Sequence, residues 1–301
     1  MDNYVLSSSF YCVVYNGQCI KANLPEGVDF ENHTICFQNQ KPVEIQFVYL
    51  LDQNESMDIN IVIKEHVEVQ MIETKIFENH SHFQKKIYVQ ESAMLHIFSE
   101  NDSSNEEDIY VKEEVFLQND ALCQCGYAEL SDGCYDGKYH YYLQGEGAQA
   151  KVRMAVLSKK KESKHYEVFI QHCCPLTYGQ MDNYGVVKDE GKLIIDGVGS
   201  ITKGQHGSAS HQTNKIMVFD EKCVAQANPY LYIDEYDVKA SHAAAVGKMD
   251  EEHLYYLQSR GLTKKQAMHL ITYGYLKPVI AVIDNKMIKE RFETALSKVG
   301  A

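Results

Sequence analysis

The residues best suited to bind a soft metal lie in the last third of the chain. Cys223 begins a strand-like segment and His242 ends the next one. If the two strands are neighbours, a thiolate and an imidazole converge at one sheet edge, and that pair suits iron or an iron–sulfur cluster. His206 and His211 are weaker candidates for the same kind of site. The alternative interpretation of each histidine is a structural side chain with satisfied hydrogen bonds.

Cys123 and Cys125 are a second candidate pair of metal ligands. Residues two apart in a strand point to the same face, about 6.6 Å apart, so both thiolates can reach one metal ion, with Cys134 as a third ligand. Structural zinc sites usually show paired Cys-x-x-Cys motifs, and the sequence around these positions has none. The favoured interpretation is that these cysteines are small buried hydrophobic residues.

A third group consists of Cys173 and Cys174 with the preceding His172. The two cysteines are adjacent in the sequence, so they face opposite sides of a strand and do not readily bind one metal together. We expect one of them to lie in the core. Either remains a possible ligand beside the histidine.

The segment His80-Ser-His82, with Glu91 downstream, is the one hint of a metal-dependent enzyme. It resembles part of a cupin metal motif, but the glycines that flank that motif are missing, so exposed turn histidines are the favoured interpretation. The chain has no phosphate-binding Gly-Lys-Ser/Thr loop, no Gly-x-Ser-x-Gly elbow and no His-Glu-x-x-His helix. We therefore expect neither hydrolase nor ATPase activity, and no bound nucleotide.

Composition places the chain among acidic globular proteins. Its 301 residues are 45% hydrophobic and 24% charged, with a formal net charge of −13. Such a chain lacks the clustered Lys and Arg that nucleic acids and anionic membranes attract, and no apolar run approaches the ~18 residues that cross a bilayer. The start has no basic signal-peptide region, so we expect a cytoplasmic protein. Its nine cysteines are then free thiols or metal ligands.

The chain up to about Gly247 alternates apolar and polar residues with period two, which predicts half-buried strands. Four segments show this pattern most clearly: 43–49, 59–63, 152–156 and 166–170. Turn dipeptides such as Asn16-Gly17 separate the strands. A sandwich or jelly roll, a barrel and a β-solenoid all fit. The lack of a repeat of fixed length counts against a regular solenoid, whereas short strands and frequent turns after Tyr127 favour stacked rungs.

The period changes after Met249, where a helical pattern begins. Asp250 can cap a first helix, and Gly261 can end it in a left-handed conformation. The spacing Thr263-x-x-Gln266 fits a capping box for a second helix, which we expect to end at Gly274.

A third helix carries apolar residues four apart at Ile288, Phe292 and Leu296. The helices offer more apolar and aromatic side chains than they need to pack on each other, which favours docking on the body or on another protein. We therefore divide the chain into a β-strand body, residues 1–248, and a C-terminal helical domain, residues 249–301.

Three segments resemble the SufB/SufD scaffold proteins of iron–sulfur cluster assembly. Gly145-Glu-Gly-Ala148 resembles the turn that opens the family's core domain, and Ser210-His-Gln-Thr-Asn214 resembles an element typical of SufD. Residues 237–261, followed by Pro278, match the family's C-terminal signature nearly end to end. The resemblance covers residues 127–283 well and the earlier strands loosely.

The resemblance implies a mainly β fold, a right-handed parallel β-helix with a small C-terminal helical domain, and so favours the solenoid among the all-β architectures. It also implies a non-enzymatic scaffold that pairs with a copy of itself or with a second SufB/SufD-like chain. In the family, the C-terminal helices bind SufC, an ABC-type ATPase. The matching docking residues are Leu254, Tyr255, Tyr256, Leu257, Arg260 and Gly261.

Residue by residue, the resemblance points to a SufD-like chain. His242 falls on the histidine of the family's interface site, whereas the assembly cysteine of SufB would fall near Asn214 and SufB's neighbouring glutamate at Ala243. Cys223 falls where many SufB proteins carry a cysteine. The expected ligands of iron or a transient iron–sulfur cluster are therefore His242, Cys223 and His211.

Three functions compete on this evidence. The first is an assembly scaffold that binds a SufC-like ATPase and helps to build or hold a cluster at a dimer interface. The second is a SufD-like structural or iron-supplying subunit that binds no cluster and needs a separate SufB. The third, remote alternative is a cupin-type metal enzyme. Most family members carry an N-terminal helical domain and this chain begins with strands, so we expect a minimal scaffold that homodimerises.

Overall fold

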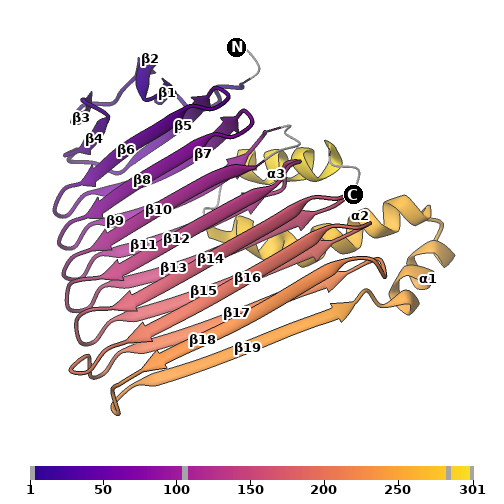
Figure 1. Cartoon of the computed structure of the whole chain (residues 1–301). Helices are drawn as coiled ribbons and strands as arrows, with labels where there is room; N and C mark the ends of the chain where they lie inside the picture. Colours follow the sequence, from indigo (N-terminus) through magenta and orange to yellow (C-terminus); the bar gives the residue numbers. More distant parts are fainter. Residues whose placement is uncertain (1–3, 104–107, 283–285, 299–301) are drawn as a thin grey trace.

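The computed structural model describes residues 4–103, 108–282 and 286–298. These residues form a long stack of strands, followed by helices that lie along one side of the stack (Figure 1). The fold is mainly β, as the alternating pattern predicts. Among the described residues, no helix is long and apolar enough to span a bilayer.

The strands form two sheets that face each other. The first sheet has the spatial order β19 (Lys239–Lys248), β17 (Ala209–Val218), β15 (Tyr178–Val187), β13 (Gln149–Ser158), β11 (Leu122–Glu129), β9 (Met94–Asn101), β7 (Glu68–Phe77), β5 (Val43–Leu51), β1 (Tyr11–Tyr15) and β2 (Gln18–Asn23). The second has the order β18 (Val224–Ile233), β16 (Lys192–Ile201), β14 (Ser163–His172), β12 (Tyr135–Leu143), β10 (Ile109–Leu117), β8 (His82–Val89), β6 (Ser56–Ile63), β4 (Thr34–Phe37) and β3 (Val28–Glu31).

Successive strands from β4 onward alternate between the two sheets, and each pairs in parallel with the strand two places along the chain. One strand from each sheet therefore makes one rung of a β-solenoid. The repeat lengthens along the stack: Glu68 pairs with Met94, 26 residues on, whereas Tyr178 pairs with Ala209, 31 residues on. This drift explains why the sequence shows no fixed repeat, and the expectation that this counts against a solenoid was wrong.

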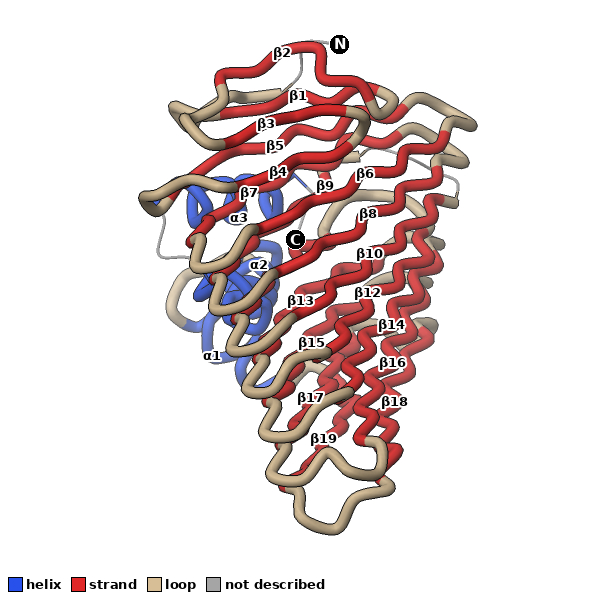
Figure 2. The backbone as a smooth tube through the Cα atoms, turned by 90° about the vertical axis from the view of Figure 1, so that its left-hand side faces the viewer, coloured by secondary structure: helices blue, strands red, loops and turns tan. Residues whose placement is uncertain are grey.

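The strands after Tyr127 are not short, contrary to expectation, because β13 to β19 each contain ten residues. Their inward side chains fill the space between the sheets, and their outward ones face solvent or the helices. The stack tapers from the β5–β6 end toward β19 (Figure 2). Side-chain size follows the taper, since Phe47 and Tyr49 fill the wide end while Gly197 and Gly199 lie inside the narrow end.

Two antiparallel hairpins, β1–β2 and β3–β4, close the wide end of the solenoid. Asn16 and Gly17 have φ angles of 44° and 82°, and Asn32 and His33 have 47° and 60°. Two consecutive left-handed residues are typical of the type I′ turn that matches the twist of a hairpin. The predicted Asn16-Gly17 turn is therefore present.

The helical segment follows β19 directly. It comprises α1 (Glu251–Ser259), α2 (Lys264–Leu276), the 3-10 helix η1 (Lys277–Val282) and α3 (Lys286–Lys298). The predicted caps are confirmed: Asp250 accepts a hydrogen bond from the backbone of Glu252, and Thr263 forms a capping box with Gln266. The prediction that Gly274 ends the second helix was wrong, because α2 continues to Leu276 and changes type beside Pro278.

These helices cover the outer face of the ten-stranded sheet. Ile288, Phe292 and Leu296 of α3 are buried with residues of η1 against outward side chains of the sheet. A side chain at Gly126 of β11 would come within 2.7 Å of the Val279 carbonyl oxygen, so this glycine lets the η1 backbone approach the sheet closely. The surplus apolar surface predicted for the helices is thus largely used within the chain.

Candidate functional site

The last rung, β18 with β19, ends the solenoid without a cover. All ten residues of β19 are exposed, and among the described residues β17 is its one strand neighbour. His242 is in register with Gln212, which is buried between the sheets, so the two lie in the same inward-facing column. His242 would be a core residue if another rung followed.

The other two predicted ligands lie elsewhere. His211 is in register with Ser241, on the outer face of the sheet, and its Nδ1 lies 2.7 Å from the Ser241 hydroxyl. Cys223 lies in the turn after β17, at the end of the rung where Val218 pairs with Lys248.

The expectation that Cys223 and His242 converge is therefore wrong for a single chain. His242 is six strand positions from Lys248, a separation of about 20 Å along the strand. Strands that are consecutive in a two-sheet solenoid cross from one sheet to the other, and the turn carries Cys223 to the far end. Burial raises the pKa of the Cys223 thiol. Among the described residues, no group of three or more His, Cys, Asp or Glu side chains is arranged to hold a metal ion.

The interior beneath the last rung is polar. The Asn214 amide donates to the Asn228 carbonyl at 3.3 Å and accepts from the Asn183 amide at 2.8 Å. Gln212 donates to the Tyr230 carbonyl at 2.8 Å, and so links the two sheets. Asn214 is completely buried. The position where the resemblance would place an assembly cysteine thus holds an amide with a structural role.

The predicted docking residues of α1 divide into two groups. Leu254 is buried against the rest of the helical segment, whereas Tyr255 and Tyr256 are 76% and 54% exposed. The Arg260 guanidinium lies over the Tyr256 ring, 5.1 Å from its centre. Gly261 follows with φ of 96° and ends the helix, as predicted.

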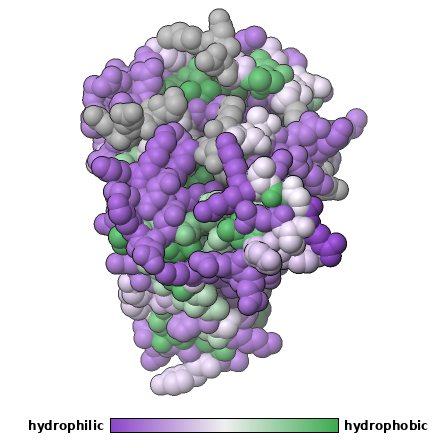
Figure 3. All heavy atoms as spheres, turned by 90° about the vertical axis from the view of Figure 1, so that its right-hand side faces the viewer, coloured by the Kyte–Doolittle hydropathy of each residue, from purple (hydrophilic) through white to green (hydrophobic). Residues whose placement is uncertain are grey.

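Seen from the side that carries α1 and α2, the molecule is mainly hydrophilic, with hydrophobic side chains in small groups (Figure 3). The exposed aromatic side chains of α1 are Tyr255 and Tyr256, which the helix presents away from its buried Leu254.

The remaining sequence candidates do not assemble into a site. Cys123 and Cys125 are buried with their sulfur atoms 3.5 Å apart, on one face as predicted. Cys134 lies in the turn before β12, where its sulfur accepts a hydrogen bond from the Ser163 backbone instead of joining them. The favoured interpretation as core residues therefore holds for the buried pair.

His172 is buried, and burial lowers its pKa to about 4. Its Nδ1 lies 2.8 Å from the Thr177 hydroxyl, and the neighbouring Cys174 sulfur lies 2.9 Å from the Gln144 carbonyl. These contacts tie the β14–β15 turn to the core and bring no metal ligands together.

The cupin-like residues also lie apart. His82 is at the start of β8, where its ring stacks on Tyr110, and His80 is in the turn before it. Glu91 follows the other end of the same strand. A strand of eight residues separates the two halves of the motif, so the structure contradicts the cupin alternative.

The interior of the solenoid contains a connected group of ionised side chains. The Lys85 ammonium lies 2.7 Å from Glu73 and 3.0 Å from Glu113, and the Lys75 ammonium lies 3.4 Å from Glu113 and 3.3 Å from Glu129. All five side chains are at most 1% exposed. We call these five residues the internal charge chain.

Tyrosines surround the internal charge chain and complete its hydrogen bonds. Tyr127 donates to Glu113 at 3.1 Å, and Tyr139 donates to Glu129 at 3.0 Å. The Tyr127 and Tyr141 hydroxyls are 2.8 Å apart. Burial of ions is costly unless each finds partners, and here every carboxylate has at least one ammonium and one hydroxyl.

The internal charge chain shifts the pKa values of Glu113 and Lys85. Burial alone would raise the pKa of Glu113, but the nearby Lys85 and Lys75 charges and the Tyr127 hydrogen bond outweigh it and lower the value. Burial alone would lower the pKa of Lys85, but Glu113 and Glu73 raise it. The ionised forms are therefore the stable ones inside the core.

Sequence reasoning missed this feature, although a signal was present. Lys85 lies on the same face of its strand as Phe83 and Ile87, and Glu113 lies between Val111 and Val115. A charged residue in the apolar column of an alternating strand is the pattern that would have indicated a buried ion.

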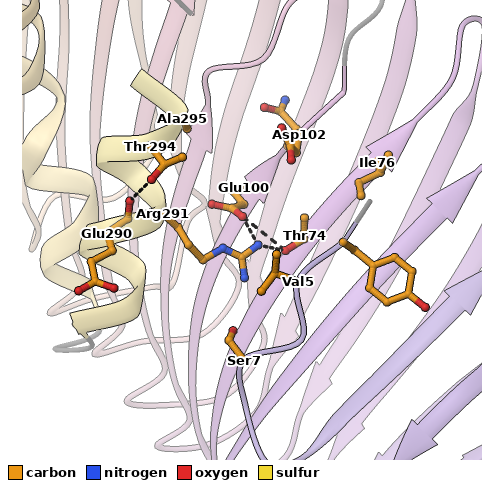
Figure 4. Close-up of a pocket in the computed structure, with 12 residues that line it drawn as sticks. Val5, Ser7, Thr74, Ile76, Glu100, Asp102, Glu290, Arg291, Thr294 and Ala295 are labelled. Carbon is orange, nitrogen blue, oxygen red and sulfur yellow. Dashed lines mark hydrogen bonds and ion pairs between the residues drawn. The ribbon is translucent and has the colours of Figure 1, made fainter. Parts of the chain in front are cut away.

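A separate contact anchors α3 to the sheet (Figure 4). The Arg291 guanidinium reaches from α3 to Glu100 and Thr74 on neighbouring strands, beside a cavity of about 350 Å³. Burial raises the pKa of Glu100, and the Arg291 charge partly offsets that rise. Val5 and Ser7 line the other side of the cavity. The arginine therefore joins three parts of the chain that are far apart in sequence.

The architecture defines a two-sheet β-solenoid protein with C-terminal helices, and comparison with known proteins gives its family. Residues 49–275 match the family model for the SufBD core domain of SUF system iron–sulfur cluster assembly. This chain belongs to the SufBD family. The family comprises generally non-catalytic components of iron–sulfur cluster assembly.

The individual relatives include both SufD and SufB proteins. The chain is 31% identical over 169 residues to the iron–sulfur cluster assembly protein SufD of Bacillus subtilis, a segment that covers 56% of this chain and 39% of the relative. Identity to SufD of Escherichia coli is 22% over 70% of this chain and 46% of that protein. Identity to SufB of Bacillus subtilis is 27% over 51% and 35%. The chain thus matches less than half the length of each of these relatives.

The internal charge chain yields a stability prediction. Lys85→Met should leave Glu73 and Glu113 buried with a single remaining ammonium, and should lower the free energy of unfolding by about 3–5 kcal/mol. Lys86→Met, at the exposed neighbouring position of β8, is the matched control and should change it by at most about 0.5 kcal/mol. Urea denaturation of both variants measures the difference. Equal changes in the free energy of unfolding in the two variants would contradict a special role for Lys85 and its buried carboxylate partners.

The same network predicts how stability depends on pH. Because folding lowers the pKa of Glu113 below its usual 4.5, its contribution is complete above that pH and is lost as the pH falls through the folded value. Because folding raises the pKa of Lys85 above 10.5, its contribution is lost only as the pH rises through the higher folded value. The contribution of these two groups to stability should therefore be flat between these limits, whereas the buried His172, whose pKa folding lowers to about 4, should reduce stability as the pH falls below its usual 6.5.

Urea midpoints measured across that range test the pH dependence. Glu113→Gln should have a lower midpoint at neutral pH and a smaller further drop below pH 4.5. Glu114→Gln, which changes the half-buried partner of Lys112 on the same strand, should keep the acid drop of the unmodified chain. An unchanged acid drop in Glu113→Gln would assign the acid sensitivity to other carboxylates.

Proposed function

We propose that this chain is a scaffold component of iron–sulfur cluster assembly whose last rung pairs with a second SufB/SufD-like chain. The observation that carries the proposal is the uncovered strand β19, with its free edge and its ten exposed residues. A long free strand edge readily accepts another strand through main-chain hydrogen bonds. Ala240, Ala244 and Val246 on its inner face leave room for close approach.

The cluster is the cargo of this interface, and we propose that two chains share it. An iron–sulfur cluster needs several thiolate or imidazole ligands. In one chain His242 lies on the inner face of β19, and among the described residues no group of three or more possible ligands is arranged to hold a metal ion. A two-fold axis close to His242 would bring the two copies of this histidine to one site, whereas each Cys223 lies about 20 Å along the rung of its own chain and is the more distant candidate ligand. The second chain is either another copy or a different SufB/SufD-like protein.

The helical segment is the proposed docking site of a SufC-like ABC ATPase. Its support is the pair Tyr255 and Tyr256, which α1 exposes while Leu254 holds the helix in place. Aromatic side chains beside an arginine, here Arg260, are frequent anchors of protein interfaces. In this assignment ATP is hydrolysed by the partner and not by this chain, and the complex works in the cytoplasm.

A second function is favoured by one observation. Asn214 is a buried amide that holds the two sheets together through Asn228, and position 243 is an alanine. A chain without ligands at these positions fits a SufD-like subunit that supports or supplies iron to a separate SufB and binds no cluster itself.

Anaerobic purification of the chain alone and co-expressed with a SufC-like ATPase separates the two functions. A scaffold should give a complex of two chains with the visible absorption of an iron–sulfur cluster, and His242→Ala should lose most of that absorption without loss of the dimer. His253→Ala, at an exposed position on α1, is the control and should keep it. A colourless complex that binds the ATPase would establish the SufD-like role.

The docking proposal has its own test. The double variant Tyr255→Ala and Tyr256→Ala should weaken ATPase binding at least about tenfold, as expected when interface anchors are removed, with an unchanged melting temperature because both rings are exposed. Tyr110→Ala, an exposed tyrosine on β10, should bind the ATPase normally. Equal binding by all three proteins would place the docking surface elsewhere.

A further inference from the structure

The end of the solenoid opposite the last rung carries a second feature, a pair of thiols in contact. The Cys12 and Cys19 sulfur atoms lie 3.5 Å apart across the β1–β2 hairpin. Cys12 is completely buried at the edge of the core, whereas Cys19 is the one exposed cysteine among the nine.

The hairpin turn produces this contact. The two-residue Asn16-Gly17 turn sets Tyr15 opposite Gln18 and Val14 opposite Cys19. Cys12 is two residues from Val14, so Cys12 and Cys19 lie on the same face of the hairpin. Val13 then pairs with Lys21, so Ile20 is the extra residue of a β-bulge that places Cys12 opposite Ala22.

We propose that Cys12 and Cys19 form a thiol modification site that is oxidised reversibly to a disulfide by low-molecular-weight disulfides. This inference is independent of cluster assembly and of the last rung. The asymmetric exposure gives the two cysteines different tasks. Cys19 is accessible to the reagent, and the buried Cys12 is accessible only to Cys19.

The reaction proceeds by two thiol–disulfide exchanges. The Cys19 thiolate attacks one sulfur of the reagent, forms a mixed disulfide and releases one thiolate of the reagent. The Cys12 thiolate then attacks the Cys19 sulfur, forms the Cys12–Cys19 disulfide and releases the second. The two protons lost by the cysteines go to the two released thiolates, so one reagent disulfide is reduced to two thiols.

Burial raises the pKa of Cys12, which slows the second step because the thiolate is the attacking species. The mixed disulfide at Cys19 is therefore a detectable intermediate. The completed disulfide joins the two strands of the hairpin that closes the wide end. It should slow the fraying of that end, since the terminal units of a solenoid open most readily.

The chain contains a natural comparison pair. Cys123 and Cys125 have the same sulfur separation of 3.5 Å, yet both are fully buried inside the solenoid. Because a reagent cannot reach these two buried thiols, they should not react with it in the folded protein, although their sulfur atoms are in contact. Reaction at the hairpin pair alone therefore tests exposure and geometry together.

The test treats the folded, reduced protein with oxidised glutathione and follows intact mass and alkylation of each cysteine. The unmodified chain should pass through a single glutathione adduct to a product that has lost two hydrogens, with Cys12 and Cys19 protected from alkylation. Excess dithiothreitol should restore both thiols. Hydrogen exchange should slow in β1 and β2 of the oxidised form.

Two variants separate the steps. Cys12→Ser should stop at the glutathione adduct on Cys19, and Cys19→Ser should react at neither position. An unmodified chain that stops at the adduct, or one in which Cys123 and Cys125 oxidise first, would overturn the proposal. These outcomes are read from the unmodified protein, so they stand even if a variant folds poorly.

Discussion

Every rung of this molecule depends on its neighbours to cover its inward side chains. Parallel pairing with the strand two places along buries each inward column between the rungs above and below. Stacking of one rung on another cannot meet this constraint at the two ends. At the wide end the chain meets it with two hairpins, β1–β2 and β3–β4. At the narrow end the chain leaves β19 exposed, and a surface of that kind is where a second chain can supply the missing cover.

The side chains inside the solenoid change along its axis because the stack tapers. Where the sheets are far apart, aromatic rings and the internal charge chain fill the space, and each ion keeps partners that offset its burial. Where the sheets converge, glycines and amides replace them, and Gln212 and Asn214 link the sheets by hydrogen bonds. The interior directly beneath His242 is therefore polar, and its hydrogen bonds join β17 to β18.

The helices occupy a different side of the solenoid. They cover the ten-stranded sheet through η1 and α3, and Arg291 ties α3 to Glu100 and Thr74. The anchoring leaves α1 to project Tyr255 and Tyr256. The open edge and the aromatic pair lie on a continuous stretch of chain, from β19 to α1.

The sequence by itself determined the mainly β class, the change to helices after Met249, the helix caps and the family. These follow from local periods and from short motifs that act through neighbouring residues. Tertiary structure decided which strands stack, and with them the positions of the predicted ligands. Period two tells which side chains share a face of one strand, but not which end of a rung a turn occupies. Cys223 and His242 were therefore expected together and lie about 20 Å apart along the rung, while Lys85 and Glu113, distant in sequence, meet inside the core.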